Sequence, residues 1–242
     1  MIDLEKLKTY KKDMEYSYTF GPFPTMELVL SRPELVERVI MSENFTEKEK
    51  FEKIFKENNI FFSYEDKTIK RIGKRENIYV LGVFKKFNCK LDKDKNHLVL
   101  DNIRDMGNLG TIIRAMTAFD IENLALIGNT CDIFNPKVVR GSMGALFKIK
   151  FKFYEDYREY KEEFPENKGY AFMLDDTAKR LHNIEIQKPY SLIFGNEGSG
   201  LGEDYEKDGD IQKVIIEQSE KVDSLNLSIA SSIGMYEFKM KG

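Results

Sequence analysis

The sequence predicts an α/β protein in which a small N-terminal domain precedes a parallel-sheet domain. From His97 onward, short apolar runs alternate with helix-length segments, an order typical of a parallel sheet covered on both faces. Three of the junctions between apolar and helical segments contain glycine or asparagine turns. A chain of 242 residues, 41% of them hydrophobic, is long enough for two domains of ordinary size.

Residues 1–90 are predicted to form the smaller unit. Phe51, Ile54 and Phe55 fall on one face of an amphipathic helix whose N-cap we expect to be Thr46. Residues 85–96 are lysine-rich and are the expected linker. The predicted elements are a helix at 26–30, a turn or helix start at Pro33, a strand at 36–41, the amphipathic helix at 46–59, and strands at 60–64 and 78–84.

Residues 91–242 are predicted to form the parallel-sheet domain, with helices on both faces. Its expected strands are residues 98–101, 123–128, 170–174, 190–195 and 214–217, and its expected helices begin near Asn108, Pro136, Thr177, Gly200 and Asn226.

The composition excludes several classes of protein. No apolar run approaches the ~18 residues that span a bilayer, and the charged residues 1–16 do not resemble a secretory signal. Two cysteines without metal-ligand spacing and two histidines predict no metal site. We therefore expect a protein of the reducing cytoplasm without a membrane partner.

The net charge of −3 argues against a broad nucleic-acid footprint. Residues 1–90 hold 18 Lys and Arg against 15 Asp and Glu, whereas residues 91–242 hold 20 against 26. A contact with a polyanion would therefore come from a local patch, and residues 67–75 hold five basic residues and no acidic one. The candidate RNA-binding residues there are Lys70, Arg71, Lys74 and Arg75, and a solvated helix face is the plainer interpretation.

Residues 101–116, DNIRDMGNLGTIIRAM, are the first of three blocks that indicate chemistry. Asn108 precedes a buried helical stripe and would make a good N-cap. Gly107 and Gly110 permit close approach of another group, and Arg114 follows on the same helix. The plain interpretation is a cap and a solvated Arg; the sharper one makes Arg114 a clamp for phosphate or an oxyanion.

The second block is residues 191–201, SLIFGNEGSGL, in which a strand ends in a turn containing Gly195, Gly198, Gly200 and Glu197. Its spacing matches neither the dinucleotide-binding fingerprint nor the phosphate-binding loop of nucleoside triphosphatases.

The third block, residues 222–238, VDSLNLSIASSIGMYEF, offers Ser224 as the N-cap of a helix with Leu225, Ile229, Ile233 and Tyr236 on its apolar face. Asn226 inside its first turn suggests a side-chain task.

Taken in order, the three blocks resemble motifs one to three of the SpoU (TrmH) family. Members of this family are S-adenosylmethionine-dependent RNA ribose 2′-O-methyltransferases of the SPOUT class. The matching patterns are N-x-G-x-x-x-R, G-N-E-G-x-G-L and S-L-N-x-S-x-A, with residues 135–147, NPKVVRGSMGALF, resembling the segment between the first two. The resemblance covers roughly residues 97–238, and residues 1–90 resemble, by element order, the L30e-like αβα domain often fused ahead of it.

The resemblance implies a fold and a set of roles. The parallel sheet would end in a deep trefoil knot, and S-adenosylmethionine would lie in the knot, leaving S-adenosylhomocysteine after transfer. A homodimer would build its active sites at the subunit interface and act on rRNA or tRNA. The cofactor-binding residues would be Gly195, Asn196, Gly198, Ile216, Gln218 and Leu225, and the catalytic residues Arg114, Asn108, Glu197, Ser224 and Asn226.

One stretch departs from the family pattern. The family usually reads I-P-M-x-G before S-L-N, whereas residues 216–220 here read IEQSE. The loop thereby gains Glu217 and Glu220, which would either meet the cationic groups of the cofactor or point to solvent.

For the reaction we expect Arg114 to stabilise the developing oxyanion and hold a flanking phosphate, because a guanidinium is a poor base. Asn108, Ser224 and Asn226 would fix loops and orient the nucleotide, and Glu197 would anchor its loop. Three other functions remain open from the sequence: a catalytically silent knotted RNA-binding protein, a SPOUT methyltransferase acting on a base, and an unrelated small-molecule enzyme.

Overall fold

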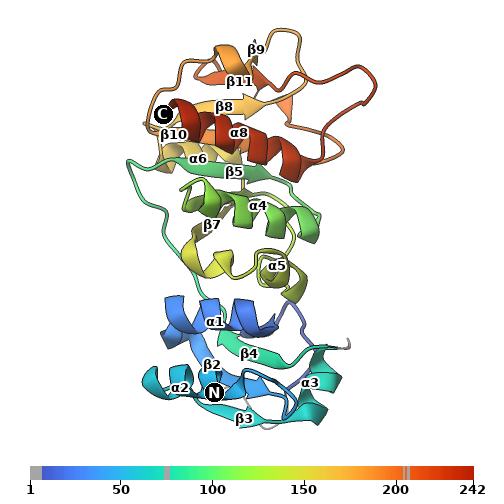
Figure 1. Cartoon of the computed structure of the whole chain (residues 1–242). Helices are drawn as coiled ribbons and strands as arrows, with labels where there is room; N and C mark the ends of the chain where they lie inside the picture. The colour runs from blue at the N-terminus through green and yellow to red at the C-terminus, as the bar shows by residue number, and fades with distance from the viewer. Residues whose placement is uncertain (1–6, 74–76, 204, 206–207) are drawn as a thin grey trace. The chain divides into compact units, whose positions relative to one another are not determined.

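A computed structural model describes residues 7–73, 77–203, 205 and 208–242 (Figure 1). The chain forms two compact units, Met1–Phe87 with Asp132–Lys148, and Asn88–Cys131 with Ile149–Gly242. The first junction lies close to the predicted boundary at residue 90. Residues 132–148, which we expected in the second domain, belong to the first unit because Ser17 Oγ donates to the Phe134 carbonyl at 2.5 Å and Lys148 pairs with Glu27.

The first unit contains a four-stranded sheet in the order β1-β4-β2-β3. Strand β1 pairs antiparallel with β4, and β4 pairs antiparallel with β2, whereas β2 and β3 are parallel. The sequence predicted three of these strands and missed β1. Their bounds are β1 (Tyr16–Phe20), β2 (Val36–Met41), β3 (Phe62–Tyr64) and β4 (Val80–Lys85).

Apolar side chains cover both faces of this sheet. Val39 and Met41 of β2 pack with Phe51 and Phe55 of α2, whereas Ile40 packs in a separate cluster that includes Ile69 of α3. The expected cap Thr46 is wrong: α2 begins after Glu47, which makes no side-chain capping bond. The helices of the unit are α1 (Pro22–Ser31), η2 (Pro33–Leu35), α2 (Lys48–Glu57), α3 (Asp66–Gly73), α5 (Pro136–Gly141) and η3 (Ala145–Lys148).

The second unit contains a seven-stranded sheet in the order β7-β6-β5-β10-β8-β11-β9, and every strand pair in it is parallel. The sequence thus predicted the class of the sheet correctly. The strands are β5 (His97–Asp101), β6 (Asn123–Ile127), β7 (Lys150–Tyr154), β8 (Lys168–Phe172), β9 (Lys179–Arg180), β10 (Tyr190–Phe194) and β11 (Ile211–Ile215).

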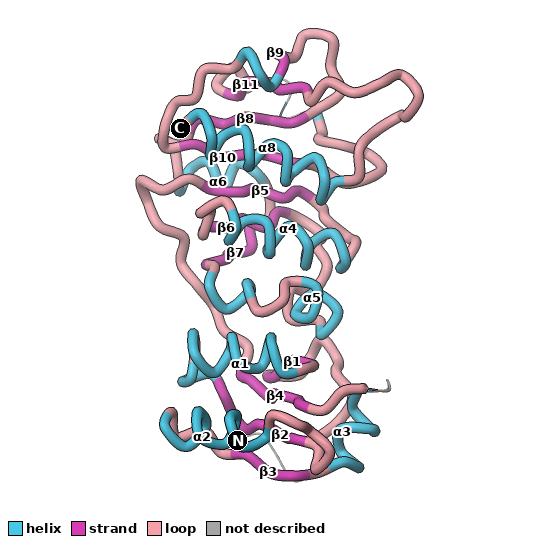
Figure 2. Tube along the Cα trace, viewed as in Figure 1, coloured by secondary structure: helices cyan, strands magenta, loops and turns pink. Residues whose placement is uncertain are grey.

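Helices lie on both faces of this sheet. Figures 1 and 2 show α4 (Met106–Ala118) and α8 (Leu227–Lys241) side by side on one face, with α6 (Tyr157–Glu163) on the other. The helix expected near Thr177 is wrong, because Asp175 accepts from both Thr177 N and Thr177 Oγ1 and closes a turn that leads into β9 and η4 (Leu181–Asn183). The helix expected near Gly200 would include residues 204, 206 and 207, which lie outside the described residues.

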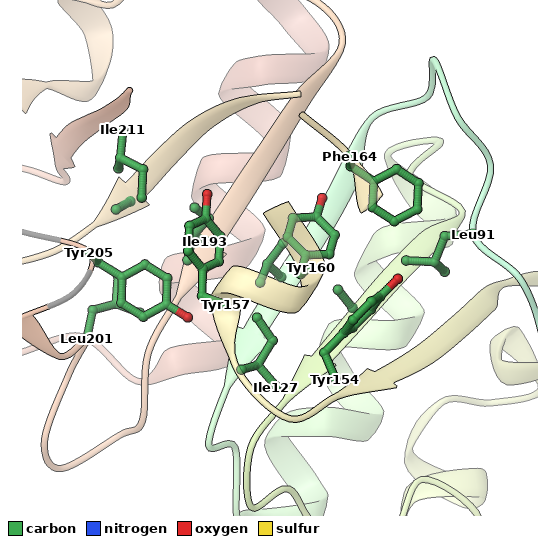
Figure 3. Packing of buried hydrophobic residues seen from close by; sticks show 13 residues of the cluster. Leu91, Ile127, Tyr154, Tyr157, Tyr160, Phe164, Ile193, Leu201, Tyr205 and Ile211 are labelled. Atoms are coloured by element: carbon green, nitrogen blue, oxygen red, sulfur yellow. The ribbon is translucent and has the colours of Figure 1, made fainter. Parts of the chain in front are cut away.

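A cluster of tyrosines forms much of the core beneath α6 (Figure 3). Tyr157 and Tyr160 are the buried residues of this otherwise polar helix, whose sequence YREYKEE shows no clear apolar stripe. Tyr205 packs against Tyr157 with ring centroids 4.7 Å apart, so the segment after β10 is joined to this core.

Among the described residues, no helix is long and apolar enough to cross a membrane. The same part of the chain has no group of three or more His, Cys, Asp or Glu arranged to hold a metal ion.

Candidate functional site

A pocket of about 700 Å³ lies at the carboxyl ends of β8, β10 and β11. The carboxyl ends of strands are the usual ligand-binding edge of a parallel α/β sheet. All six predicted cofactor-binding residues line this pocket, as do Glu197 and Ser224. Its lining includes Phe172 to Asp175, Phe194 to Leu201, Val214, Ile216, Gln218, Asp223 to Leu225, Leu227 and Ala230.

The glycine-rich loop after β10 forms one wall of the pocket. The backbone N–H groups of Asn196 and Gly200 each donate to the other residue's carbonyl, at 3.1 and 3.0 Å. Asn196 Oδ1 accepts from Gly198 N at 2.9 Å, while its Nδ2 donates to the Asn102 carbonyl at 2.9 Å. A Cβ on Gly195 would lie 2.3 Å from Gly200 carbonyl atoms, so only glycine fits where the loop closes on itself.

A chain of side-chain hydrogen bonds joins the three blocks at this pocket. Asn226 Nδ2 donates to Asn108 Oδ1 at 3.0 Å, and Asn108 Nδ2 donates to Glu197 Oε1 at 3.1 Å. Each amide therefore has one fixed orientation, with the carboxylate as the final acceptor. The structure thus brings together three of the five predicted catalytic residues.

Two of the predicted caps are wrong, and both corrections concern these residues. Asp105, rather than Asn108, caps α4, because Asp105 Oδ1 accepts from Asn108 N at 2.7 Å. Asn226, rather than Ser224, caps α8, because Asn226 Oδ1 accepts from Ser228 N at 2.9 Å. The side chain of Asn108 is thereby left to bond Asn226 and Glu197, whereas Asn226 both caps its helix and reaches Asn108.

The loop that departs from the family pattern holds Glu217 outside the pocket. Glu217 pairs with Arg180 Nη1 at 3.2 Å and with His182 Nδ1 at 2.8 Å, and it does not line the pocket. Gln218 does line it, and its Nε2 donates to the Asp223 carbonyl at 3.1 Å. The loop therefore turns Gln218 inward and Glu217 outward.

Arg114 lies on α4 and is exposed, and it does not line the pocket of its own chain. Six residues separate it from Asn108, which places it about 240° around the helix. Within the part of the chain that the structure describes, Arg114 forms no ion pair. A single subunit thus aims Asn108 at Glu197 and presents Arg114 elsewhere on α4.

Sequence reasoning missed the apolar floor of the pocket. Phe172 and Phe194 stack with centroids 4.3 Å apart, and both line the pocket. Gly234 of α8 lies against them, since a Cβ there would approach Phe172 Cζ to 2.8 Å. The available signal was the position of Phe172 at the end of a parallel strand that leads into Asp175.

The pocket is acidic. Asp175, Glu197 and Asp223 line it, and none of the described residues lining it is Lys, Arg or His. Lys213 donates to Asp175 Oδ2 at 2.5 Å, and this bond, together with Thr177, holds the pKa of the Asp175 carboxyl well below its usual range. A pocket with this charge fits a ligand that carries a positive group.

The predicted basic patch lies in the first unit. Lys70 and Arg71 are exposed on α3, whose inner side buries Ile69 and Ile72. Lys74 and Arg75 lie outside the described residues.

Comparison with protein-family models identifies the family to which the chain belongs. The model of the SpoU rRNA methylase family matches residues 95–236. The chain belongs to this family. The match includes all three blocks and also residues 132–148, which pack in the first unit.

Curated relatives are methyltransferases that the chain matches in part. An uncharacterized tRNA/rRNA methyltransferase of Synechocystis sp. is 32% identical over 58% of this chain and 51% of its own length. The 23S rRNA (guanosine(2553)-2′-O)-methyltransferase RlmP of Bacillus subtilis is 29% identical over 62% of this chain and 60% of its own length. The chain thus spans about half to three-fifths of these relatives.

Solved structures share the fold over nearly the whole chain. The AdoMet-bound rRNA methyltransferase from Sinorhizobium meliloti aligns with a TM-score of 0.79 and 24% identity, covering 93% of this chain and 87% of that chain. The SpoU methyltransferase AviRb from Streptomyces viridochromogenes aligns with a TM-score of 0.78 and 18% identity, covering 94% and 90%. At these identities the likeness concerns the fold.

Proposed function

We propose that this protein transfers a methyl group from S-adenosylmethionine to a ribose 2′-hydroxyl of RNA. The chain of hydrogen bonds from Asn226 through Asn108 to Glu197 carries the proposal, because it unites the three family motifs beside one pocket. The family assignment and the RNA 2′-O-methyltransferase among its relatives point to the same reaction. An rRNA substrate is favoured by the family description, and tRNA is the alternative.

The pocket fits the cofactor in size, polarity and charge. A volume of about 700 Å³ lies within the range of small-molecule sites. Phe172, Phe194 and Leu227 offer apolar surface, while the 195–200 loop offers backbone groups. The acidic lining suits a cation, and the bound cofactor would supply a methyl group on positively charged sulfur. The sulfur would leave as a neutral thioether as the bond to the 2′-oxygen forms, and the hydroxyl proton would pass to solvent water.

Arg114 would act on the RNA. A guanidinium beside the attacking 2′-oxygen stabilises the negative charge that develops there, and its fork also suits a neighbouring phosphate. Asn108 and Asn226 would hold the nucleotide and the two loops in register, with Glu197 anchoring the glycine loop and Ser224 lining the pocket. Because Arg114 is exposed and does not line the pocket of its own chain, we assign it to the active site of a second subunit.

A homodimer would place that second subunit on α8. Ile229, Ile233, Tyr236 and Met240 form an exposed stripe along this helix, with Tyr236 52% and Met240 66% exposed. The sequence placed Ile229, Ile233 and Tyr236 on the apolar face of this helix, and within one chain that face is exposed. The stripe lies next to the helix of Arg114, because Tyr236 meets Phe119 at the end of α4 with centroids 6.0 Å apart.

The remaining assignments rest on the family. A trefoil knot is supported by the position of β10 between β5 and β8, with α8 packed against both α4 and β10. The four-stranded first unit, covered on both faces, supports an L30e-like RNA-binding domain. The chain holds only two cysteines, Cys89 and Cys131, in keeping with a reducing cytoplasm.

The decisive experiment separates methyl transfer from cofactor binding. Arg114→Ala should abolish transfer of tritiated methyl to RNA and leave the calorimetric affinity for S-adenosylhomocysteine within about twofold of wild type. Arg158→Ala, on α6 at the other face of the sheet, is the control and should keep both properties. Near wild-type turnover in Arg114→Ala would remove Arg114 from the mechanism, and failure of the wild type to bind the ligand would indicate a silent RNA-binding protein.

The position of the methyl group is tested on the product. Mass spectrometry of nucleosides from the modified RNA should show a 2′-O-methyl nucleoside, whereas a methylated base would contradict the proposal.

For the basic patch, replacing Lys70 and Arg71 by Ala should weaken RNA binding and lower the slope of log affinity against log salt by about 1–2. The same replacement of Lys50 and Lys53 on α2 is the control.

A further inference from the structure

The loop between β11 and α8 reaches its position without the proline and glycine of the family pattern. Instead, Gln218 bridges it: its Nε2 donates to the carbonyls of Asp223 at 3.1 Å and Val222 at 3.5 Å. The Val222 N–H also donates to the Ser219 carbonyl at 3.4 Å. One side-chain amide thus joins the two ends of the loop and fixes the backbone of Asp223.

The three carboxylates that line the pocket differ in what already binds them. Asp175 accepts from Lys213 and Thr177, and Glu197 accepts from Asn108. The carboxylate of Asp223 forms no hydrogen bond or ion pair with any described residue, although it lines the pocket and its backbone is held by Gln218. It is therefore the acidic group of the pocket that remains available to a ligand.

We propose that the Asp223 carboxylate binds the ammonium group of the cofactor's amino-acid end and that Gln218 positions it. This inference rests on the proposed function. A carboxylate only accepts hydrogen bonds, and the ammonium offers three donors whereas the sulfonium offers none. An ionic hydrogen bond of this kind is among the stronger polar contacts.

The other charged residues of this loop do not line the pocket and so cannot replace Asp223 as the acceptor. Glu217 on the same loop pairs with Arg180 and His182 and faces away from the pocket. Glu220 and Lys221 are exposed and do not line the pocket. Residue 218 is Gln where the family usually has Met, and the hydrogen bond from this Gln218 holds the backbone of Asp223 in position.

Two ligands separate this contact from the rest of the pocket. S-adenosylhomocysteine carries the amino-acid end, whereas 5′-methylthioadenosine keeps the adenosine and the sulfur but lacks that end. By calorimetry on the full chain, Asp223→Asn should weaken the first ligand about tenfold and leave the second within about twofold. Gln218→Leu should change the ratio of the two affinities in the same direction, because it releases the backbone that presents Asp223.

Glu220→Gln is the matched control, since it removes a carboxylate from the same loop outside the pocket, and both affinities should persist. Equal weakening of both ligands by Asp223→Asn would overturn the inference by assigning the carboxylate to the adenosine half or to loop stability. Unchanged affinity for S-adenosylhomocysteine would also overturn it. Failure of the wild type to bind either ligand would instead overturn the proposed function on which the inference rests.

Discussion

The side-chain amide of Asn226 donates to the side-chain carbonyl of Asn108 at 3.0 Å, across 118 residues of sequence. The same Asn226 side chain accepts from Ser228 N at the start of α8. One residue thereby performs two tasks with opposite ends of its amide, a helix cap through oxygen and a link between motifs through nitrogen. The two tasks can be separated by substitution.

Asn226→Ala removes both bonds, whereas Asn226→Asp keeps the capping oxygen and removes the donor to Asn108. We expect Asn226→Ala to lower the free energy of unfolding by about 1 kcal/mol. Asn226→Asp should stay close to wild type in urea unfolding, because an acidic N-cap is favourable, and yet lose most methyl transfer. Equal stability loss in both variants would show that the link to Asn108, rather than the cap, stabilises the fold.

The closure of the 195–200 loop predicts a sharp difference between two glycines. Gly195→Ala should abolish measurable binding of S-adenosylhomocysteine, because the added Cβ would overlap the backbone of Gly200. Gly202→Ala should bind normally, because no atom of the described residues lies within 4 Å of a Cβ at that position. Calorimetry on the two variants, with circular dichroism to confirm folding, tests the pair; binding by Gly195→Ala would contradict the role of this tight turn as the ligand wall.

The exposed stripe of α8 predicts the assembly state. Ile233→Glu places a charge in the middle of the stripe, and we expect it to convert a dimer to a monomer in light scattering coupled to size exclusion. Leu30→Glu is the control, since Leu30 is 59% exposed on α1 and its substitution should leave the dimer intact. A wild-type protein that is monomeric at micromolar concentration would refute the dimer and the shared active site together.

A buried histidine predicts how stability depends on pH. His97 Nε2 meets the Asp92 carbonyl at 2.9 Å and Nδ1 meets Tyr160 OH at 2.8 Å, an arrangement that suits a neutral ring. Burial lowers the pKa of His97, despite the opposing influence of Asp92 and Glu163. Below about pH 6.5 the unfolded state then binds more protons than the folded state. The contribution of neutral His97 to the free energy of unfolding is therefore fully present at neutral pH and is lost as the pH falls below about 6.5 toward the lowered pKa of the folded state.

His97→Gln should reduce this dependence. We expect the urea midpoint of the wild type to fall more between about pH 7.5 and pH 5.5 than that of His97→Gln. His182→Gln, which replaces the exposed histidine, should retain the wild-type loss. Parallel midpoints for the wild type and His97→Gln would show that other groups govern stability in acid.

The sequence predicted the parallel sheet because some of its strands, such as β6 and β10, are fully buried and read as continuous apolar runs. It missed β7 and α6 for the opposite reason, since KFKFY and YREYKEE carry charged residues and each buries only two aromatic residues three positions apart. The division of the chain was also hidden, because residues 132–148 are joined to the first unit through contacts such as Ser17 with Phe134. Such contacts between distant segments leave no local pattern.

For the site, motif order located the pocket but not the task of each side chain. Short-range capping rules chose Asn108 and Ser224, whereas the structure uses Asp105 and Asn226. Periodicity correctly grouped Ile229, Ile233 and Tyr236 on one face of α8, but it could not say which face is buried. Gly234 faces inward because Phe172 and Phe194 fill the space beneath it, and the small residue Ser231 is buried on the same helix.

The pocket has walls that are made at very different times during synthesis. Phe172, at the end of β8, leaves the ribosome early, whereas Leu227 and Ala230 of α8 line the same pocket and emerge more than 50 residues later. A nascent chain that has folded its sheet but lacks α8 therefore has an open-sided cavity without the Asn226 cap. Binding that requires the complete pocket therefore follows the docking of α8.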